Sequence, residues 1–271
     1  MLAAVKLLAA RFSDVWLETA DTNAAKELST FCRKFATPLR NALETQGLLA
    51  LNDPSLPRLH LFFQASTAVY PALSDPALAA PWLMGIPRLK LARAAPSRAA
   101  LKLEEAFHTF FGPAERNRCL RPGMRAVDLG AAPGGWTWLL AQHHLRVTAV
   151  DNGALLPELL ESGLVEHIRT DGFRYRPPRP VDWMVCDIVE QPSRIAKLVS
   201  DWLRRDDCRY CIFNLKLPMK KRYEEVRRCQ SMIREGCWEA GDFRLAFKQL
   251  YHDRAEVTGF AARASASARR G

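Results

Sequence analysis

Four ionisable side chains are candidates for proton transfer: Lys102, Asp187, Lys216 and Glu256. Lys216 ends an otherwise apolar stretch, YCIFNLK. A lysine that acts as a base must lose its proton near neutral pH, although the pKa of a free lysine is about 10.4. Burial and a second cation both lower the pKa of a lysine, and Lys102 could be that cation. Asp187 and Glu256 would then orient the two amino groups.

Each of these residues also has an ordinary interpretation. Lys216 could extend its amine to solvent, Lys102 could lie on a solvated helix face, and Glu256 could form a salt bridge at a sheet edge. Four such residues around one predicted cleft favour chemistry, because ionisable groups with perturbed pKa values gather at functional sites.

A glycine-rich turn, GAAPGG at residues 130–135, lies between an apolar strand and an apolar helix. Small residues let the backbone turn sharply and let a ligand approach it, and the first amides of the helix face that ligand. The spacing is neither that of the dinucleotide fingerprint nor that of a P-loop. The turn therefore favours a nucleoside without a pyrophosphate, and S-adenosylmethionine is the obvious candidate. The alternative is a plain glycine-rich turn in another doubly wound fold.

The elements that would position these residues alternate between strand and helix. Strands are expected at residues 125–129, 146–150, 165–169, 182–186 and 210–215, and an antiparallel pair at 243–252 and 257–263 closes the edge. This order predicts an α/β fold with a doubly wound, mostly parallel, Rossmann-like sheet. Ligands bind at the carboxyl ends of such strands, where Asp151, Asp171, Asp187 and Lys216 fall. Asp151 is well placed for ribose hydroxyls, about twenty residues after the turn.

The first 95 residues predict a smaller α/β unit that ends in a basic linker. We expect helices at residues 2–12 and 24–47, a strand at 15–19, and a hairpin at 59–64 and 67–73. Pro38 should kink or split the longer helix. Residues 1–95 would then form an incomplete α/β unit and linker, residues 96–263 the Rossmann-like domain, and residues 264–271 a basic, disordered tail.

Composition points to a polyanionic partner. The chain has 271 residues, 48% of them hydrophobic, and a net charge of +10. Such a charge favours nucleic acid, although a merely soluble basic protein would also carry it. The odd number of scattered cysteines, 7, indicates reduced thiols in a cytoplasm. No stretch approaches the roughly 20 apolar residues of a membrane span. Cys208 and Cys211 have metal-ligand spacing but lack a second pair, so we expect no metal.

Five segments resemble the bacterial large-subunit ribosomal RNA methyltransferase M family: PSRAALKLEEAF, VDLGAAPGGWTWLL, WMVCD, IFNLKLPMKKRYEEV and QLYHDRAEVT. The likeness covers about residues 12–263. It implies transfer of a methyl group from S-adenosylmethionine to a cytidine ribose 2′-oxygen in 23S rRNA. A Lys-Asp-Lys-Glu tetrad is shared by related 2′-O-methyltransferases and would be Lys102, Asp187, Lys216 and Glu256, with Lys216 accepting the 2′-hydroxyl proton. The implied cofactor contacts are Ala99, Ala132, Pro133, Gly134, Gly135, Asp151, Asp171 and Asp187.

The resemblance also implies departures and leaves alternatives. Family members carry a complete RNA-binding domain of the THUMP type, of which this chain has only the latter part. Ala132 stands where relatives often carry Cys, and Ala99 where a relative carries Ser. The same chemistry on a different RNA and a non-catalytic RNA-binding assembly protein remain alternatives. The intact tetrad argues against the second, and the glycine spacing against an NAD dehydrogenase. We expect a cytoplasmic monomer.

Two further sets of residues are candidates for RNA contact. Lys220, Lys221, Arg222, Arg227 and Arg228 follow Lys216 closely and favour phosphate contact that positions the RNA without reading its sequence. An ordinary solvated helix surface is the alternative for this basic cluster. Trp136 and Trp138 are expected to pack in the core or against the cofactor turn rather than to stack on bases.

Overall fold

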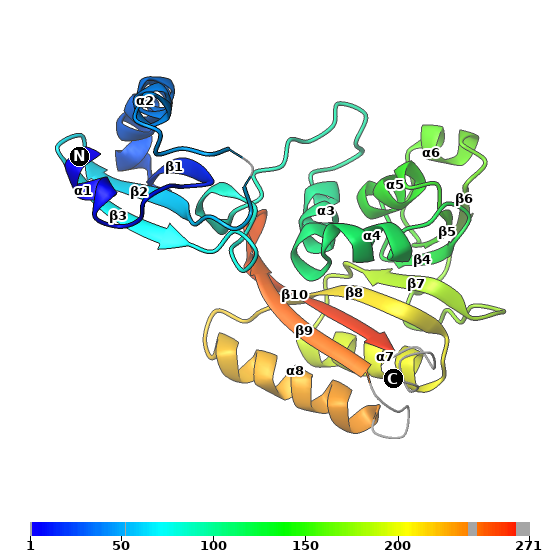
Figure 1. Cartoon of the computed structure of the whole chain (residues 1–271). Coiled ribbons are helices and arrows are strands. Elements are labelled where there is room, and N and C mark those ends of the chain that lie inside the picture. Colours follow the sequence, from blue (N-terminus) through cyan, green and yellow to red (C-terminus); the bar gives the residue numbers. More distant parts are fainter. Residues whose placement is uncertain (1, 52, 238–242, 264–271) are drawn as a thin grey trace, which may run out of the picture. The chain divides into compact units, whose positions relative to one another are not determined.

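The computed structural model describes residues 2–51, 53–237 and 243–263. Two compact units divide the chain, Met1–Pro87 and Arg88–Gly271 (Figure 1). Each unit has its own hydrophobic core, and each is described by itself below.

The first unit is a three-stranded sheet with one long helix. Its strands are β1 (Asp14–Thr19), β2 (Arg58–Ala65) and β3 (Ala68–Ser74), in the order β1-β2-β3. β1 and β2 are parallel, and the predicted hairpin of β2 and β3 is confirmed. The helices that accompany them are α1 (Leu2–Lys6), η1 (Asn23–Ala25), α2 (Lys26–Thr45) and η2 (Leu83–Gly85). Alternate residues of β2 are buried with the apolar face of α2, as expected for a sheet covered on one face.

One prediction for this unit is wrong, and one of the two alternatives given for Pro38 is excluded. The helix expected at residues 2–12 ends at Lys6, and Phe12 forms an extended bridge with Leu49 instead. Phe12 is fully buried, so tertiary packing overrides its helical spacing. Pro38 does not split the longer helix, because α2 continues through it to Thr45. Pro38 lies on the exposed side of the helix, and buried side chains before and after it, Cys32 and Leu39, hold both halves against the same core.

The second unit is built on a seven-stranded sheet in the order β6-β5-β4-β7-β8-β10-β9. The parallel strands are β4 (Arg125–Leu129), β5 (Arg146–Val150), β6 (Val165–Ile168), β7 (Val181–Cys186) and β8 (Cys208–Lys216). The antiparallel pair is β9 (Phe243–Leu250) and β10 (Asp253–Arg263). The predicted mostly parallel, Rossmann-like sheet is therefore confirmed.

Helices cover both faces of this sheet (Figure 1). One face packs against α3 (Ala99–Phe110), α4 (Pro113–Cys119) and α5 (Gly135–Gln142). The other packs against α7 (Pro192–Arg204) and α8 (Arg222–Gly236). A short α6 (Pro157–Glu161) follows β5. Successive residues of β7, Trp183 and Met184, are fully buried in opposite clusters, which shows that both faces are covered. Sequence patterns did not predict α4, a short and mostly polar helix.

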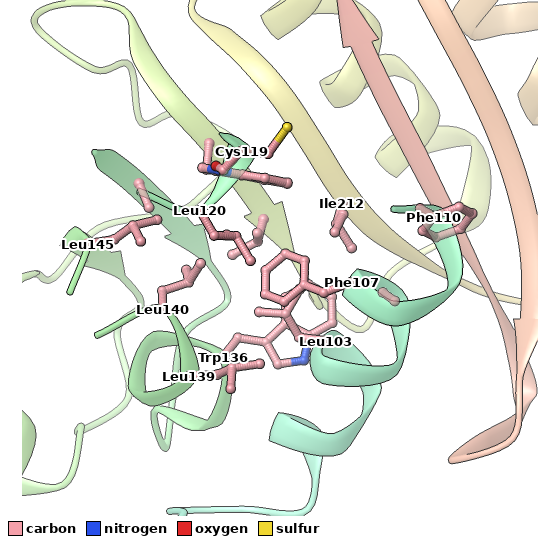
Figure 2. Packing of buried hydrophobic residues seen from close by; sticks show 14 of the residues in the cluster. Leu103, Phe107, Phe110, Cys119, Leu120, Trp136, Leu139, Leu140, Leu145 and Ile212 are labelled. Carbon is pink, nitrogen blue, oxygen red and sulfur yellow. The ribbon is translucent and has the colours of Figure 1, made fainter. Parts of the chain in front are cut away.

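The position of α3 is fixed by a dense apolar contact with α5. Leu103 and Phe107 are fully buried and face Trp136 and Leu140 (Figure 2). The Trp136 indole Nε1 also donates to the Ala99 carbonyl at 2.9 Å. The expected packing role of Trp136 is confirmed, and α3 is tied to the glycine-rich turn that precedes α5.

Candidate active site

Three neighbouring strands bring Asp187, Lys216 and Glu256 together. β7 and β8 are parallel, so Asp187, directly after β7, and Lys216, the last residue of β8, lie at the same edge of the sheet. β10 is antiparallel to β8, and Glu256 is the registered partner of Lys216. Lys102 reaches this edge from α3, which packs on the sheet. The structure therefore brings together all four residues singled out in the sequence.

The four side chains form a closed ring of alternating charge. The Lys102 Nζ lies 2.8 Å from an oxygen of Asp187 and 3.1 Å from an oxygen of Glu256. The Lys216 Nζ lies 2.6 Å from the other oxygen of Asp187 and donates to the other oxygen of Glu256. Two ammonium groups and two carboxylates thus balance one another, each cation touching both anions.

Burial makes this balance important. The four side chains are between 9% and 20% exposed, and a charge removed from water needs a partner. Burial acts to raise the pKa of Asp187, but Lys102 and Lys216 outweigh it and lower the pKa below the usual range. Burial acts to lower the pKa of Lys102, but Asp187 and Glu256 outweigh it and raise the pKa. Lys102 is therefore a firmly held cation at neutral pH.

Sequence reasoning missed a polar chain behind the ring. The Asn214 amide donates to Asp187 at 3.0 Å, and the Thr258 hydroxyl donates to the Asn214 carbonyl oxygen at 2.7 Å. Asn214 and Thr258 are buried, registered partners, each two residues from a member of the ring, Lys216 and Glu256 respectively. The signal was an amide within the apolar stretch CIFNLK, two residues before the lysine and so on the same face of the strand.

The glycine-rich turn has the tight backbone that its composition predicted. Gly130 and Gly134 have φ values of 79° and 114°, which favour glycine. A Cβ at Gly134 would lie 2.2 Å from a Leu159 methyl carbon, and one at Gly135 would lie 2.3 Å from the Ser97 hydroxyl oxygen and 3.4 Å from the Ala99 Cβ. The start of α3, including Ala99, therefore lies against the turn. The Ser97 hydroxyl also lies against the turn and accepts the Ala99 amide at 3.3 Å.

Two of the expected cofactor-binding carboxylates, Asp151 and Asp171, lie at the ends of neighbouring strands. Asp151 directly follows β5 and accepts the amides of Ala132 at 3.0 Å and Gly153 at 2.7 Å. It therefore braces the glycine-rich turn, and each of its oxygens keeps further acceptor capacity. Asp171 lies beyond β6, is about half exposed and accepts the Phe173 amide at 2.9 Å. Because the sheet order is β6-β5-β4-β7, the edge presents Asp171, then Asp151, then Asp187.

A buried carboxyl group beneath the turn was not singled out in the sequence. Asp128, in β4, is 1% exposed; one of its oxygens accepts the Thr137 hydroxyl at 2.6 Å, and the other has no hydrogen-bond partner among the described residues. Burial raises the pKa of Asp128 to about 7, with smaller contributions from the charges of Asp187 and Asp151. This group can change its protonation state near neutral pH.

Comparison with known proteins identifies both units. Residues 1–75 match the family model "Ribosomal RNA large subunit methyltransferase M, N-terminal", and residues 95–233 match "FtsJ-like methyltransferase". A curated relative from Methylococcus capsulatus, named ribosomal RNA large subunit methyltransferase M, is 62% identical over 251 residues, which are 92% of this chain and 70% of the relative. The chain belongs to the ribosomal RNA large subunit methyltransferase M family.

Other members of the methyltransferase M family show the same likeness. The relative from Azotobacter vinelandii is 57% identical over 90% of this chain and 69% of its own length. The relative from Aromatoleum aromaticum is 54% identical over 93% of this chain and 68% of its own length. The likeness stated from sequence motifs is therefore confirmed.

The remaining candidate residues of this methyltransferase M family member are surface cations and thiols. Lys220 and Lys221, in the loop between β8 and α8, and Arg222, the first residue of α8, are exposed. Cys208 and Cys211 are buried in β8. Within residues 2–51, 53–237 and 243–263, no group of three or more metal-ligating side chains gathers. None of the helices in those ranges has the length and apolar character to cross a membrane.

Proposed function

We propose that this chain transfers a methyl group from S-adenosylmethionine to the ribose 2′-oxygen of a cytidine in 23S rRNA, with Lys216 as the proton acceptor. Its relatives are named ribosomal RNA large subunit methyltransferases. The observation that carries the proposal is the ring of Lys102, Asp187, Lys216 and Glu256 at the carboxyl edge of a methyltransferase sheet. Perturbed ionisable groups gathered at such an edge are typical of an active site.

The residues of the adjacent turn fit the cofactor. The amides at the start of α5 and the small side chains of residues 130–135 leave room for a nucleoside to approach the backbone. Asp151 and Asp171 can accept hydrogen bonds from ribose hydroxyls and ring amino groups. The residues that would hold the cofactor are Ala99, Ala132, Pro133, Gly134, Gly135, Asp151, Asp171 and Asp187. When bound, S-adenosylmethionine supplies an electrophilic methyl group on a positively charged sulfur.

Lys102 supports the proposed role of Lys216 as the base. Lys216 must be a neutral amine when it takes the 2′-hydroxyl proton, and its release from the ring leaves Asp187 and Glu256 with one cation fewer. Lys102 contacts both carboxylates and keeps its proton, so it still compensates them. This role differs from the sequence-based idea that Lys102 chiefly lowers the pKa of its neighbour.

The step balances without any other reactant. The Lys216 amine takes the proton of the 2′-hydroxyl while that oxygen forms a bond to the methyl carbon. Bound S-adenosylmethionine would supply the methyl carbon, and its sulfur would keep the bonding electron pair as a neutral thioether. Asp187 and Glu256 orient the Lys216 amine toward the hydroxyl, which is a positioning contribution. A positioned base of this kind contributes about 10²–10⁴-fold to a rate.

Two surfaces are proposed to hold the RNA. Lys220, Lys221 and Arg222 are close in sequence to Lys216 and suit phosphate contact. The unit of residues 1–87 has the sheet and helix of a small α/β module, and we propose that it binds rRNA as a THUMP-like unit. Arg227 and Arg228 extend the basic surface along α8. A monomer acting in the cytoplasm remains our expectation.

Methyl transfer to rRNA tests this function. Purified chain would be incubated with radiolabelled S-adenosylmethionine and unmodified 23S rRNA, with 16S rRNA as the matched control. We expect label in 23S rRNA alone, at one cytidine, as an alkali-resistant 2′-O-methyl linkage. Label at a base atom, or label in 16S rRNA alone, would contradict the proposal.

A further inference from the structure

Glu105, a buried acidic residue of α3, makes a set of contacts separate from those of the ring. Glu105 lies three residues after Lys102, so the two side chains share one side of the helix. The Glu105 side chain is 4% exposed. Its carboxylate accepts the Tyr251 amide at 2.7 Å, the His252 amide at 3.0 Å and the His252 ring Nδ1 at 2.6 Å. One buried carboxylate thus binds the whole turn between β9 and β10.

That turn needs support because the ladder beside it is interrupted. Asp253 pairs with Leu250, whereas Thr258 pairs with Lys248, so the register of β10 against β9 shifts between these two pairs. Glu256 lies inside the shifted stretch. The pairing of Glu256 with Lys216 on β8 holds Glu256 on one side. The turn bound by Glu105 holds the first residues of β10. Residues in a bulged stretch are otherwise free to bend away from the sheet.

Lys102 connects the two sets of contacts. Its Nζ lies 3.1 Å from Glu256 and 3.7 Å from Asp253, the first residue after the turn. A shift of the turn would therefore change the contacts of Lys102 and Glu256 together. Because Glu256 also binds Lys216, the change would reach the proposed base.

We propose that Glu105 is a positioning residue for methyl transfer: by binding the Tyr251–His252 turn it sets the place of Glu256, and through Glu256 the orientation of Lys216. This inference rests on the proposed function of Lys216 as the base. Within the described part of the chain, Glu105 forms an ion pair with His252 and none with a member of the ring, so it acts through the backbone of β10.

Glu105→Gln tests the proposal with little change in shape, because the amide keeps one acceptor oxygen and replaces the other with a donor. Glu104→Gln is the matched control, since Glu104 is the neighbouring residue and pairs with His108 instead. We expect Glu105→Gln to lower kcat about tenfold, as small misplacements of reacting groups do, with the KM for S-adenosylmethionine within twofold of the parent. Glu104→Gln should leave kcat within twofold.

Two measurements that do not depend on turnover accompany the kinetics. Hydrogen exchange of the peptide that contains Tyr251 and His252 should speed up at least fivefold in Glu105→Gln. Acetylation of Lys102 and Lys216 by acetic anhydride, followed by mass spectrometry, should speed up at least threefold. Both rates should stay unchanged in Glu104→Gln. If the parent chain methylates no RNA, the proposed function fails, and the acetylation rates still decide whether Glu105 positions the ring.

The proposal is overturned if kcat and the acetylation rates of Glu105→Gln match those of Glu104→Gln. Should Glu105→Gln fail to fold, as seen by circular dichroism, His252→Ala takes its place. That variant removes the contact of the His252 imidazole with Glu105 and keeps the two backbone hydrogen bonds, so we expect a decrease in kcat of about threefold. An unchanged kcat in a folded His252→Ala would likewise overturn the proposal.

Discussion

Replacing Asp128 by Asn should change how stability depends on pH. The pKa of Asp128 is about 7 in the folded chain, chiefly because of burial, and about 3.9 in an unfolded chain. A carboxyl group with a raised folded pKa stabilises the fold fully below the unfolded value. That contribution is lost as the pH rises through the folded value. Three pKa units correspond to about 4 kcal/mol in all, of which about 3 kcal/mol falls between pH 5 and pH 8.

Denaturant unfolding at a series of pH values measures this effect. The free energy of unfolding would be obtained for the parent chain and Asp128→Asn from pH 5 to pH 8, following tryptophan fluorescence. We expect the parent to lose about 3 kcal/mol relative to the variant across this range. The variant retains an acceptor for the Thr137 hydroxyl, so the comparison isolates the titration. Parallel curves for the two proteins would refute the reasoning, because they would mean that Asp128 does not titrate in this range.

Three further predictions concern the turn, the ring and the thiols. Gly134→Ala should weaken S-adenosylmethionine binding at least tenfold, measured by calorimetry, because the new Cβ would clash with Leu159 and the backbone φ of 114° disfavours alanine. The control Gly163→Ala, whose Cβ would meet open space, should leave binding unchanged. Asp187→Asn should lower kcat at least 100-fold. The pKa of Asp187 is lowered in the folded chain, so the parent should also lose stability as the pH falls below about 4, whereas the variant should lack this loss. Burial raises the pKa of the Cys211 thiol, so iodoacetamide should label this thiol only in unfolded protein. Fast labelling of Cys211 in the folded protein at pH 7 would contradict the reasoning.

The sheet could be predicted because its parallel strands are short, apolar runs, such as residues 125–129 and 146–150, that need no knowledge of their partners. Asp187 and Lys216 could be placed at one edge for the same reason, since each follows a predicted parallel strand. Strand patterns alone do not place Lys102 beside Glu256, because 154 residues separate the two. That pairing was expected from the residue types and from the family resemblance instead.

Other features depend on tertiary packing that local patterns do not encode. Phe12 has helical spacing, yet its burial requires an extended backbone. Glu104 and Glu105 are adjacent and chemically identical, yet one pairs near the surface and the other is buried against the β9–β10 turn. Asn214 shows the opposite case, because an amide inside an apolar strand was a readable sign of a buried polar contact.

The central claim is that Lys216 accepts the 2′-hydroxyl proton, and a single-turnover measurement tests it most directly. Parent chain, Lys216→Ala and the exposed control Lys197→Ala would be mixed in excess with 23S rRNA and saturating labelled S-adenosylmethionine. We predict that Lys216→Ala binds the cofactor normally but transfers methyl groups at least 100-fold more slowly, while Lys197→Ala matches the parent. Transfer by Lys216→Ala at the parent rate would contradict the account.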